Sequence, residues 1–209
     1  MQSLSHAEVE GILTPMDDRL PQGTIQVDSA RYGALLQVVE AIASHADLQG
    51  LVQDLARLLP LLVPVNFVGL SLYDAQRDMM RLHVLRANVP ADIIGGQESH
   101  PSDTPAGLVW QTQQPVILSD LAEEHRWPKL IALMREDAVQ SCCLVPLTSA
   151  VRQLGALAFS SLEKDAYRVS DLELMQQIGR QVAVAVENVL NREAAAAARQ
   201  DVERQRDRF

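Results

Sequence analysis

The stretch QSCCLVPLTSAVRQLGALAFSS, from Gln140 to Ser161, decides the fold of this chain. It contains two runs of mostly apolar residues, SCCLVPL and LGALAFSS, joined by a turn around TSAVRQ. Strands so close in sequence pair antiparallel as a hairpin. An amphipathic helix is predicted next, capped by Ser170 with Glu173 three residues later and continuing beyond Asn191. This order is typical of a sheet with a helix packed on one face.

The two cysteines of the chain, Cys142 and Cys143, are adjacent in the first of these strands. Successive side chains of a strand alternate between its faces, so the two thiols are predicted on opposite faces. Their Cα atoms are ~3.8 Å apart, below the ~4.4–6.8 Å usual in a disulfide. No C-x-x-C or H-x-x-H spacing indicates a metal site. We expect buried cysteines that behave as small hydrophobes, one of which faces a ligand pocket.

Upstream, the periodicity predicts two helices followed by a second hairpin. The first helix begins near Asp28, and the second opens at Asp47 and is closed by Pro60 and Pro64. VNFVGLSLYD and MMRLHVLRA alternate as strands of a hairpin. Between the two hairpins we expect a loop over residues 88–105, a short helix in PAGLVWQTQQ, a short strand in PVILSD and a helix in WPKLIALMRED.

This order of elements predicts an α+β sandwich. A central, mostly antiparallel sheet of five or six strands would have the N- and C-terminal helices on one face. The loop and short-helix insertion, roughly residues 88–138, would cover the other face. We expect a poorly ordered lead-in over residues 1–27, one domain over 28–192 and a helical extension over 193–209.

Composition and charge exclude several classes of protein. The chain has 209 residues, of which 47% are hydrophobic and 22% charged, the balance of a soluble globular protein. A formal charge of −9 argues against a nucleic-acid-binding surface, because such surfaces are basic. The first residues lack the pattern of a signal peptide, and no apolar run is long enough to span a bilayer. We therefore expect a cytoplasmic location.

The segment from Ser141 to Leu190 closely resembles the second half of a GAF domain. The family pattern places Val-Pro-Leu at the end of a strand and Leu-Gly-x-Leu after a turn. It continues with an aromatic residue, a Ser-Asp cap and a helix that ends in Val-Ala-x-Ala-x-x-Asn. The matching residues here are Val145, Pro146, Leu147, Leu154, Gly155, Leu157, Tyr167, Ser170, Asp171, Val182, Ala183, Ala185 and Asn188.

Two further segments, TPAGLVWQTQQPVILSDL and RWPKLIALMREDAVQSCCLVPL, resemble the sensory domain of sigma-54-dependent activators of the formate hydrogenlyase type. The resemblance covers roughly residues 30–192 and implies a non-catalytic, small-molecule sensory domain of a bacterial transcriptional regulator. Such activators also contain an ATPase domain, yet no G-x-x-x-x-G-K-[ST] motif occurs in this chain. The chain is therefore either an excised sensor or a stand-alone GAF regulator. We favour the excised sensor, in contact with sigma-54 RNA polymerase only through domains that this chain lacks.

The resemblance implies a ligand pocket between the sheet and the insertion. Both tryptophans and several polar residues of the insertion suit a small ligand. The ligand-binding candidates, with the two thiols, are Trp110, Asp120, Arg126, Trp127, Arg135, Cys142 and Cys143. A small anion held by Arg126 or Arg135 is the predicted ligand, because a guanidinium grips a carboxylate with two prongs. An apolar or nucleotide ligand is the next candidate. No catalytic residue, metal ligand or cofactor is predicted.

We also expect a homodimer through the terminal helices, because the apolar stripe of the last helix is wider than one sheet face requires. The candidate interface residues are Leu35, Val39, Leu174, Ile178, Ala185 and Val189. Two alternatives stay open at this point. One is a thiol-dependent redox sensor, or an enzyme like the free methionine sulfoxide reductases, that uses Cys142 or Cys143. The other is a dimerisation module without a ligand.

Overall fold

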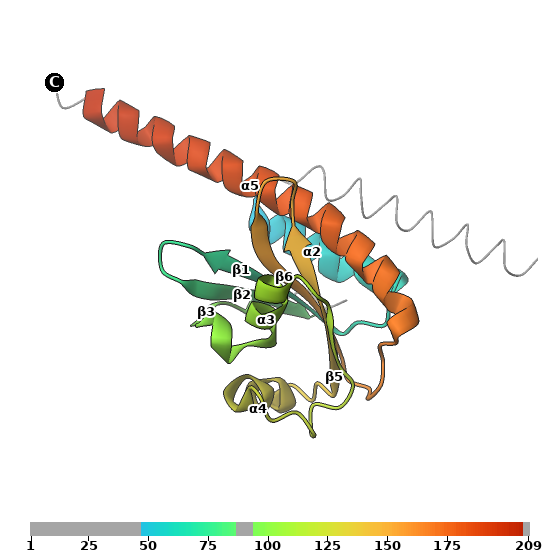
Figure 1. The fold of residues 1–209 in the computed structure, drawn as a ribbon. Helices are drawn as coiled ribbons and strands as arrows, with labels where there is room; N and C mark the ends of the chain where they lie inside the picture. Colours follow the sequence, from blue (N-terminus) through green and yellow to red (C-terminus); the bar gives the residue numbers. More distant parts are fainter. Residues whose placement is uncertain (1–46, 87–93, 207–209) are drawn as a thin grey trace, which may run out of the picture.

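The structure, a computed structural model, describes residues 47–86 and 94–206, and its centre is one sheet of six antiparallel strands (Figure 1). The strand order is β3-β2-β1-β6-β5-β4, with every neighbouring pair antiparallel. This confirms the predicted α+β class and the predicted sheet. The strands are β1 Phe67–Asp74, β2 Met79–Arg86, β3 Ile94–Ser99, β4 Val116–Leu118, β5 Ser141–Thr148 and β6 Gln153–Ser161.

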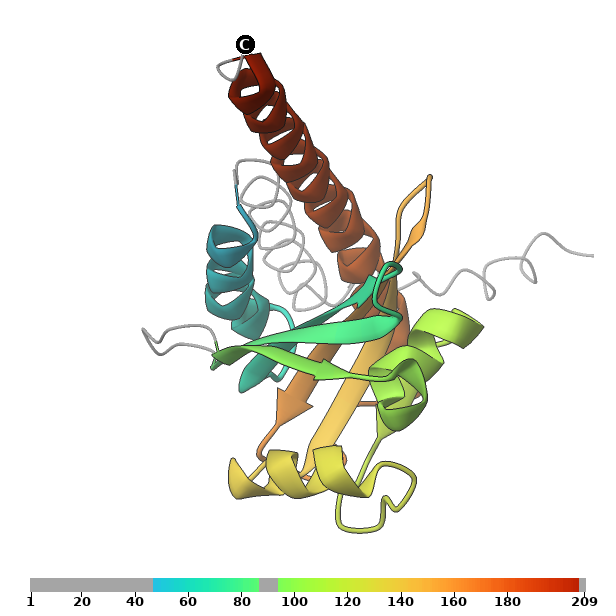
Figure 2. The ribbon, with the colours of Figure 1, turned by 90° about the vertical axis from the view of Figure 1, so that its left-hand side faces the viewer.

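One face of the sheet packs against two helices, α2 Leu48–Leu58 and α5 Leu172–Arg206 (Figures 1 and 2). α2 begins where predicted, because Asp47 Oδ1 accepts a hydrogen bond from the Gly50 N–H at 2.8 Å. A 3-10 turn that contains Pro60 follows its last residue. The large residues of β1 and β6 point to this face, and they form a core with the two helices.

The other face carries α3 Pro105–Thr112 and α4 Pro128–Glu136, both from the insertion. α3 is capped by Thr104, whose hydroxyl oxygen accepts from the Gly107 N–H at 3.0 Å. A proline opens each helix, where its missing N–H costs nothing. A second core forms here around Met80, Val109 and Leu121. Two separate cores, one on each face, therefore hold the sheet between two layers.

Two local predictions were wrong. Residues 94–99 are strand β3 rather than part of a loop, and β3 lies at the edge of the sheet against β2. Its sequence, IGGQES, has no strand alternation, so pairing with β2 determines it. The predicted cap of the last helix was also wrong. Ser170 lies inside a 3-10 turn, and Asp171 Oδ2 accepts the hydrogen bond from the Arg168 N–H at 3.0 Å.

α5 is longer than the sheet that it covers, and its second half extends past the body (Figures 1 and 2). Leu190 is still partly buried against the core, whereas residues 191–200 are all exposed. No helix in the described ranges is long and apolar enough to cross a membrane. The predicted helix from Asp28, with Leu35 and Val39, and the predicted lead-in lie outside the described residues.

Candidate ligand site

A cavity of about 190 Å³ lies between the sheet and the insertion. Its floor is made by small residues on the two central strands: Gly69 and Ser71 of β1, and Ala158 and Ser160 of β6. Gly69 lies directly opposite Ala158 in the β1–β6 ladder, so two of these small residues are adjacent on the same face of the sheet. Large residues occupy the alternate positions, on the helix side. The sheet is therefore hollow on one face only.

The insertion supplies the walls and the roof of this cavity. Gln97 and Ser99 of the edge strand stand on one side, with Thr104 at the start of α3. α4 closes the cavity with apolar side chains and with Asp137 at its C-terminal cap. The remaining lining residues are Phe67, Met80, Leu82, Val84, Pro105, Ala106, Leu130, Leu133, Met134, Val139, Cys142 and Leu144.

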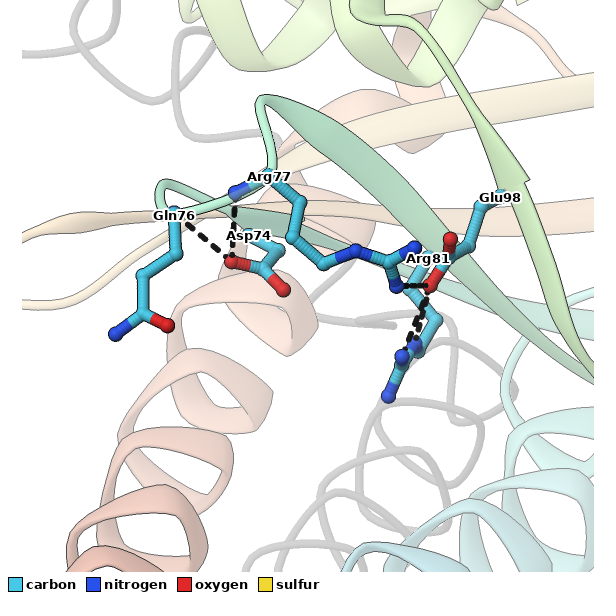
Figure 3. A network of polar contacts seen from close by, with 5 residues as sticks. All are labelled: Asp74, Gln76, Arg77, Arg81 and Glu98. Carbon is cyan, nitrogen blue, oxygen red and sulfur yellow. Dashed lines mark hydrogen bonds and ion pairs between the residues drawn. The ribbon is translucent and has the colours of Figure 1, made fainter.

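A polar cluster fixes the edge of the sheet next to the cavity (Figure 3). Glu98 of β3 accepts hydrogen bonds from Arg77 and from Arg81, the latter at 2.9 Å. Asp74 accepts from the backbone N–H groups of Gln76 and Arg77 at 2.9 and 3.3 Å, which shapes the β1–β2 turn. The pKa of Glu98 lies below its usual value, chiefly because of its hydrogen bond with Arg81. The edge strand that carries Gln97 and Ser99 is thereby tied to the central hairpin.

Few polar groups face the cavity. Ser160 Oγ donates to Cys142 Sγ at 3.3 Å, and both side chains are buried. Ser71 is 5% exposed, and the side-chain hydrogen bonds found in the described ranges do not include its hydroxyl. No lysine, arginine or histidine from the described ranges belongs to the lining, and Asp137 is its one carboxylate. The cavity is therefore mainly apolar, with no basic side chain on its wall.

The two cysteines lie on opposite faces of β5, in agreement with the alternation read from the sequence. Cys142 faces the cavity, and Cys143 belongs to the core beneath α2 and α5. Burial raises the pKa of Cys142 to about 12 and raises the pKa of Cys143 further. Both thiols are therefore protonated at neutral pH, and a protonated thiol is a poor nucleophile. Within residues 47–86 and 94–206, no group of three or more His, Cys, Asp or Glu side chains is placed to hold a metal ion.

The two tryptophans among the predicted site residues pack against the protein instead of lining the cavity. The Trp110 ring stacks on Tyr73 with 3.8 Å between centroids, and its Nε1 donates to the Gln153 carbonyl at 3.3 Å. Trp110 borders a different, wide surface groove. Trp127 is 6% exposed in the insertion core, and the Arg126 guanidinium lies 4.4 Å from its ring centroid.

The predicted charged candidates also lie outside the cavity lining. Asp120 pairs with Lys164 at 2.6 Å, and this contact lowers the pKa of the Asp120 carboxyl. Arg126 pairs with Glu124 at 2.6 Å, which lowers the pKa of Glu124 to about 2. Arg135 is exposed in the last turn of α4. Of the seven candidates only Cys142 lines the cavity, so a ligand role for the others stays a prediction.

The predicted dimer residues of the last helix are occupied within one chain. Ile178 and Ala185 are 0% and 4% exposed in the core beneath α5, and Leu174 is packed against this core; Val189 is 1% exposed. A role of these residues in a dimer stays a prediction. Val184 and Val202, at 52% and 65% exposed, lie on the solvent side of α5.

The small residues of the floor were the signal that the candidate list missed. In FVGLSLYD, Gly69 and Ser71 alternate with Val68, Leu70 and Leu72, and in LGALAFSS, Ala158 and Ser160 flank Phe159. Small residues at every second position of two strands indicate a hollow face if the strands are neighbours. That adjacency is not visible in the sequence.

Comparison with known proteins agrees with this architecture. The GAF domain family model matches residues 45–187. The formate hydrogenlyase transcriptional activator FhlA of Escherichia coli is 24% identical over 164 residues, covering 75% of this chain and 23% of FhlA. The DNA-binding transcriptional activator HyfR of the same organism is 24% identical over 175 residues, covering 78% of this chain and 25% of HyfR. The chain thus spans about a quarter of the length of these curated relatives.

Solved structures show the same fold at low identity. The GAF domain of an Acinetobacter phosphoenolpyruvate-protein phosphotransferase superimposes with a TM-score of 0.63 at 15% identity, covering 80% of this chain and 97% of that one. A free methionine-R-sulfoxide reductase from Neisseria meningitidis, in complex with its substrate, gives 0.61 at 16% identity, covering 78% and 92%. The second of these is named a reductase, whereas the curated relatives are named transcriptional activators, so the shared fold does not choose between an enzyme and a regulator.

Proposed function

The chain belongs to the GAF domain family, and from this premise we propose that it is a non-catalytic sensory domain of a bacterial transcriptional regulator. A small molecule would bind in the cavity between the sheet and α3 and α4. The supporting relatives are named transcriptional activators. A cytoplasmic location and an output domain of the sigma-54-dependent kind, outside this chain, belong to the same proposal.

The observation that supports a sensor most directly is the double role of strand β5. Cys142 and Leu144 point into the cavity, whereas Cys143 and Val145 point into the core beneath α5. A Cβ added to Gly179 of α5 would lie only 2.9 Å from Val145 Cγ2, so the helix touches the strand closely. A ligand that displaces β5 therefore also moves α5, because packed cores transmit small shifts.

The output of the sensor would be the arrangement of two α5 helices. Val184, Ala195, Ala198 and Val202 are exposed and share one side of α5, at intervals of eleven, three and four residues, which suit a helix–helix seam. We expect light scattering to give a dimer at tens of micromolar, and Val184→Glu to weaken it. Val151→Glu, at an exposed turn position, is the matched control. A wild-type monomer under these conditions would contradict the dimer.

Ligand binding is tested by extraction. Small molecules released from the denatured, purified protein are identified by mass spectrometry, with Ala158→Leu as the comparison because the larger side chain fills the floor of the cavity. We expect a compound that is present with the wild type and reduced with the variant. If nothing is enriched, and no compound of a metabolite panel raises the melting temperature, the chain is a dimerisation module without a ligand.

The enzymatic alternative uses the same protein sample. Both thiols are buried and held protonated, so we expect no turnover of free methionine sulfoxide with thiol reductants. Turnover that Cys142→Ala or Cys143→Ala abolishes, with the fold intact by circular dichroism, would replace the sensor by a reductase.

A further inference from the structure

The described part of the cavity wall carries negative charge and no positive charge. Among the described residues, Asp137 is the single charged side chain of the lining, and it lies at the C-terminal cap of α4. The C-terminal end of a helix carries partial negative charge, which adds to that of the carboxylate. The guanidinium of Arg126 is engaged by Glu124 outside the lining. On the described part of the wall, an anion would therefore meet the negative charge of Asp137 and no positively charged side chain.

A charge placed in such a site pays for its lost hydration without compensation. The rest of the described wall is built mainly from aliphatic, aromatic and thioether side chains, among them Phe67, Met80 and Met134. These side chains favour apolar parts of a ligand and offer no hydrogen bonds to its polar parts. The other polar side chains of the wall, such as those of Gln97, Ser99 and Thr104, are uncharged. The chemistry of the wall thus favours an uncharged, mainly apolar molecule over the predicted small anion.

The hydroxyl of Ser71 is a hydrogen-bonding group that a ligand in the cavity can reach. Ser71 lies on the floor and is 5% exposed, and no hydrogen bond of its hydroxyl is found in the described ranges. In the described residues the fully buried hydroxyl without a partner is that of Tyr167, which is outside the lining, whereas Ser71 lines the cavity. A ligand with a hydroxyl or carbonyl group would therefore gain a hydrogen bond with the Ser71 hydroxyl. Thr104 at the wall is less available, because its oxygen already caps α3.

Size gives the last constraint. The cavity holds about 190 Å³, and an engineered cavity of about 150 Å³ accommodates benzene. We propose that the ligand of this domain is an uncharged, mainly apolar molecule of about the size of a substituted benzene ring, with one hydrogen-bonding group directed at Ser71. This inference rests on the proposed function, since it names the ligand class of the same cavity.

The test uses four probes with one shared ring: toluene, benzyl alcohol, benzoate and benzylamine. Their dissociation constants with the full chain are measured by ligand-observed NMR at pH 7.5. We expect benzyl alcohol to bind most tightly and benzoate at least about 100-fold more weakly, because its buried charge would be unpaired. Benzylamine should also bind more weakly than benzyl alcohol.

Two variants locate the binding. Ser71→Ala should weaken benzyl alcohol about five-fold, the value of one hydrogen bond, and leave toluene unchanged. Ala158→Leu should abolish binding of both, whereas Ala195→Leu, the same change on the exposed part of α5, should have no effect. Should Ala158→Leu fail to fold, Gly69→Ala is the second variant, since its new methyl group meets only side chains, the nearest at 3.3 Å.

The outcomes separate this inference from the proposed function. Benzoate or benzylamine binding more tightly than benzyl alcohol, and lost in Ala158→Leu, would overturn the ligand class but keep the cavity as a ligand site. Probe binding that is indifferent to Ala158→Leu and Gly69→Ala would overturn both. If no probe binds at millimolar concentration, the proposed ligand class is wrong. The proposed sensory function then depends on the result of the extraction experiment.

Discussion

Replacing Gly155 by alanine should destabilise this domain far more than a typical surface substitution. Gly155 is the glycine of the Leu-Gly-x-Leu motif on β6 and lies opposite Leu72 of β1. A Cβ at this position would fall 1.9 Å from the carbonyl oxygen of Ser71, 2.9 Å from its carbonyl carbon and 3.0 Å from Leu72 Cα. All three atoms belong to the backbone, so no side-chain rotation relieves the contact.

The magnitude follows from the required displacement. The two central strands must separate locally by more than about 1 Å, which breaks about two ladder hydrogen bonds, each contributing about 1 kcal/mol. Part of the packing of Leu72 is lost as well, and the lower entropy of the unfolded alanine chain offsets some of the cost. We expect a loss of about 2–3 kcal/mol of unfolding free energy, or roughly 4–12 °C in melting temperature for a chain of this size.

Urea denaturation followed by circular dichroism measures this value, with Gly69→Ala as the matched control. Gly69 lies on the neighbouring strand, but its added methyl group faces the cavity and meets Ala158 Cβ at 3.3 Å. The control should cost less than about 1 kcal/mol. Equal stabilities of the two variants would show that the close approach at Gly155 does not determine the cost. Because the displaced carbonyl belongs to Ser71, Gly155→Ala should also weaken ligand binding.

Three further predictions concern the thiols, the aromatic stack and the long helix. Burial raises the Cys142 pKa from 9.0 to about 12, so the stabilisation by the buried neutral thiol is complete below pH 9 and is lost as the pH rises from 9 towards 12. Cys142→Ala should therefore flatten the decline of unfolding free energy in this pH range. Parallel declines in the wild type and the variant would contradict the burial of the thiol. Trp110→Ala should cost about 2 kcal/mol through the lost stack on Tyr73, yet leave benzyl alcohol affinity unchanged, as calorimetry and NMR would show. Truncation after Asn191 should keep the melting temperature within about 3 °C and yield a monomer by light scattering, since residues 192–200 are exposed in the single chain; a truncated chain that stays dimeric would disprove the seam.

The sequence by itself determined the elements whose signals are local. The apolar runs around Cys142 and Phe159 predict β5 and β6, and the periodicity after Asp171 predicts α5, because strand and helix periods are properties of neighbouring residues. The opposite orientation of Cys142 and Cys143 follows from the same alternation. The family motifs were also readable, since Gly155 and Pro146 are fixed by backbone geometry.

The edge strand and the cavity were decided by tertiary structure alone. β3 has glycines where a strand would have alternating residues, and it is extended because β2 offers unpaired backbone groups. The cavity depends on Gly69 and Ala158 lying opposite each other, although 89 positions separate them in the chain. Trp110, Arg126 and Trp127 are residue types that are common in binding sites, but none of them lines the cavity. Trp110 stacks on Tyr73, Arg126 pairs with Glu124, and Trp127 is buried in the insertion core. Residue type shows what a side chain is able to bind, whereas the register between distant strands sets which side chains share a space, and no local period encodes that register.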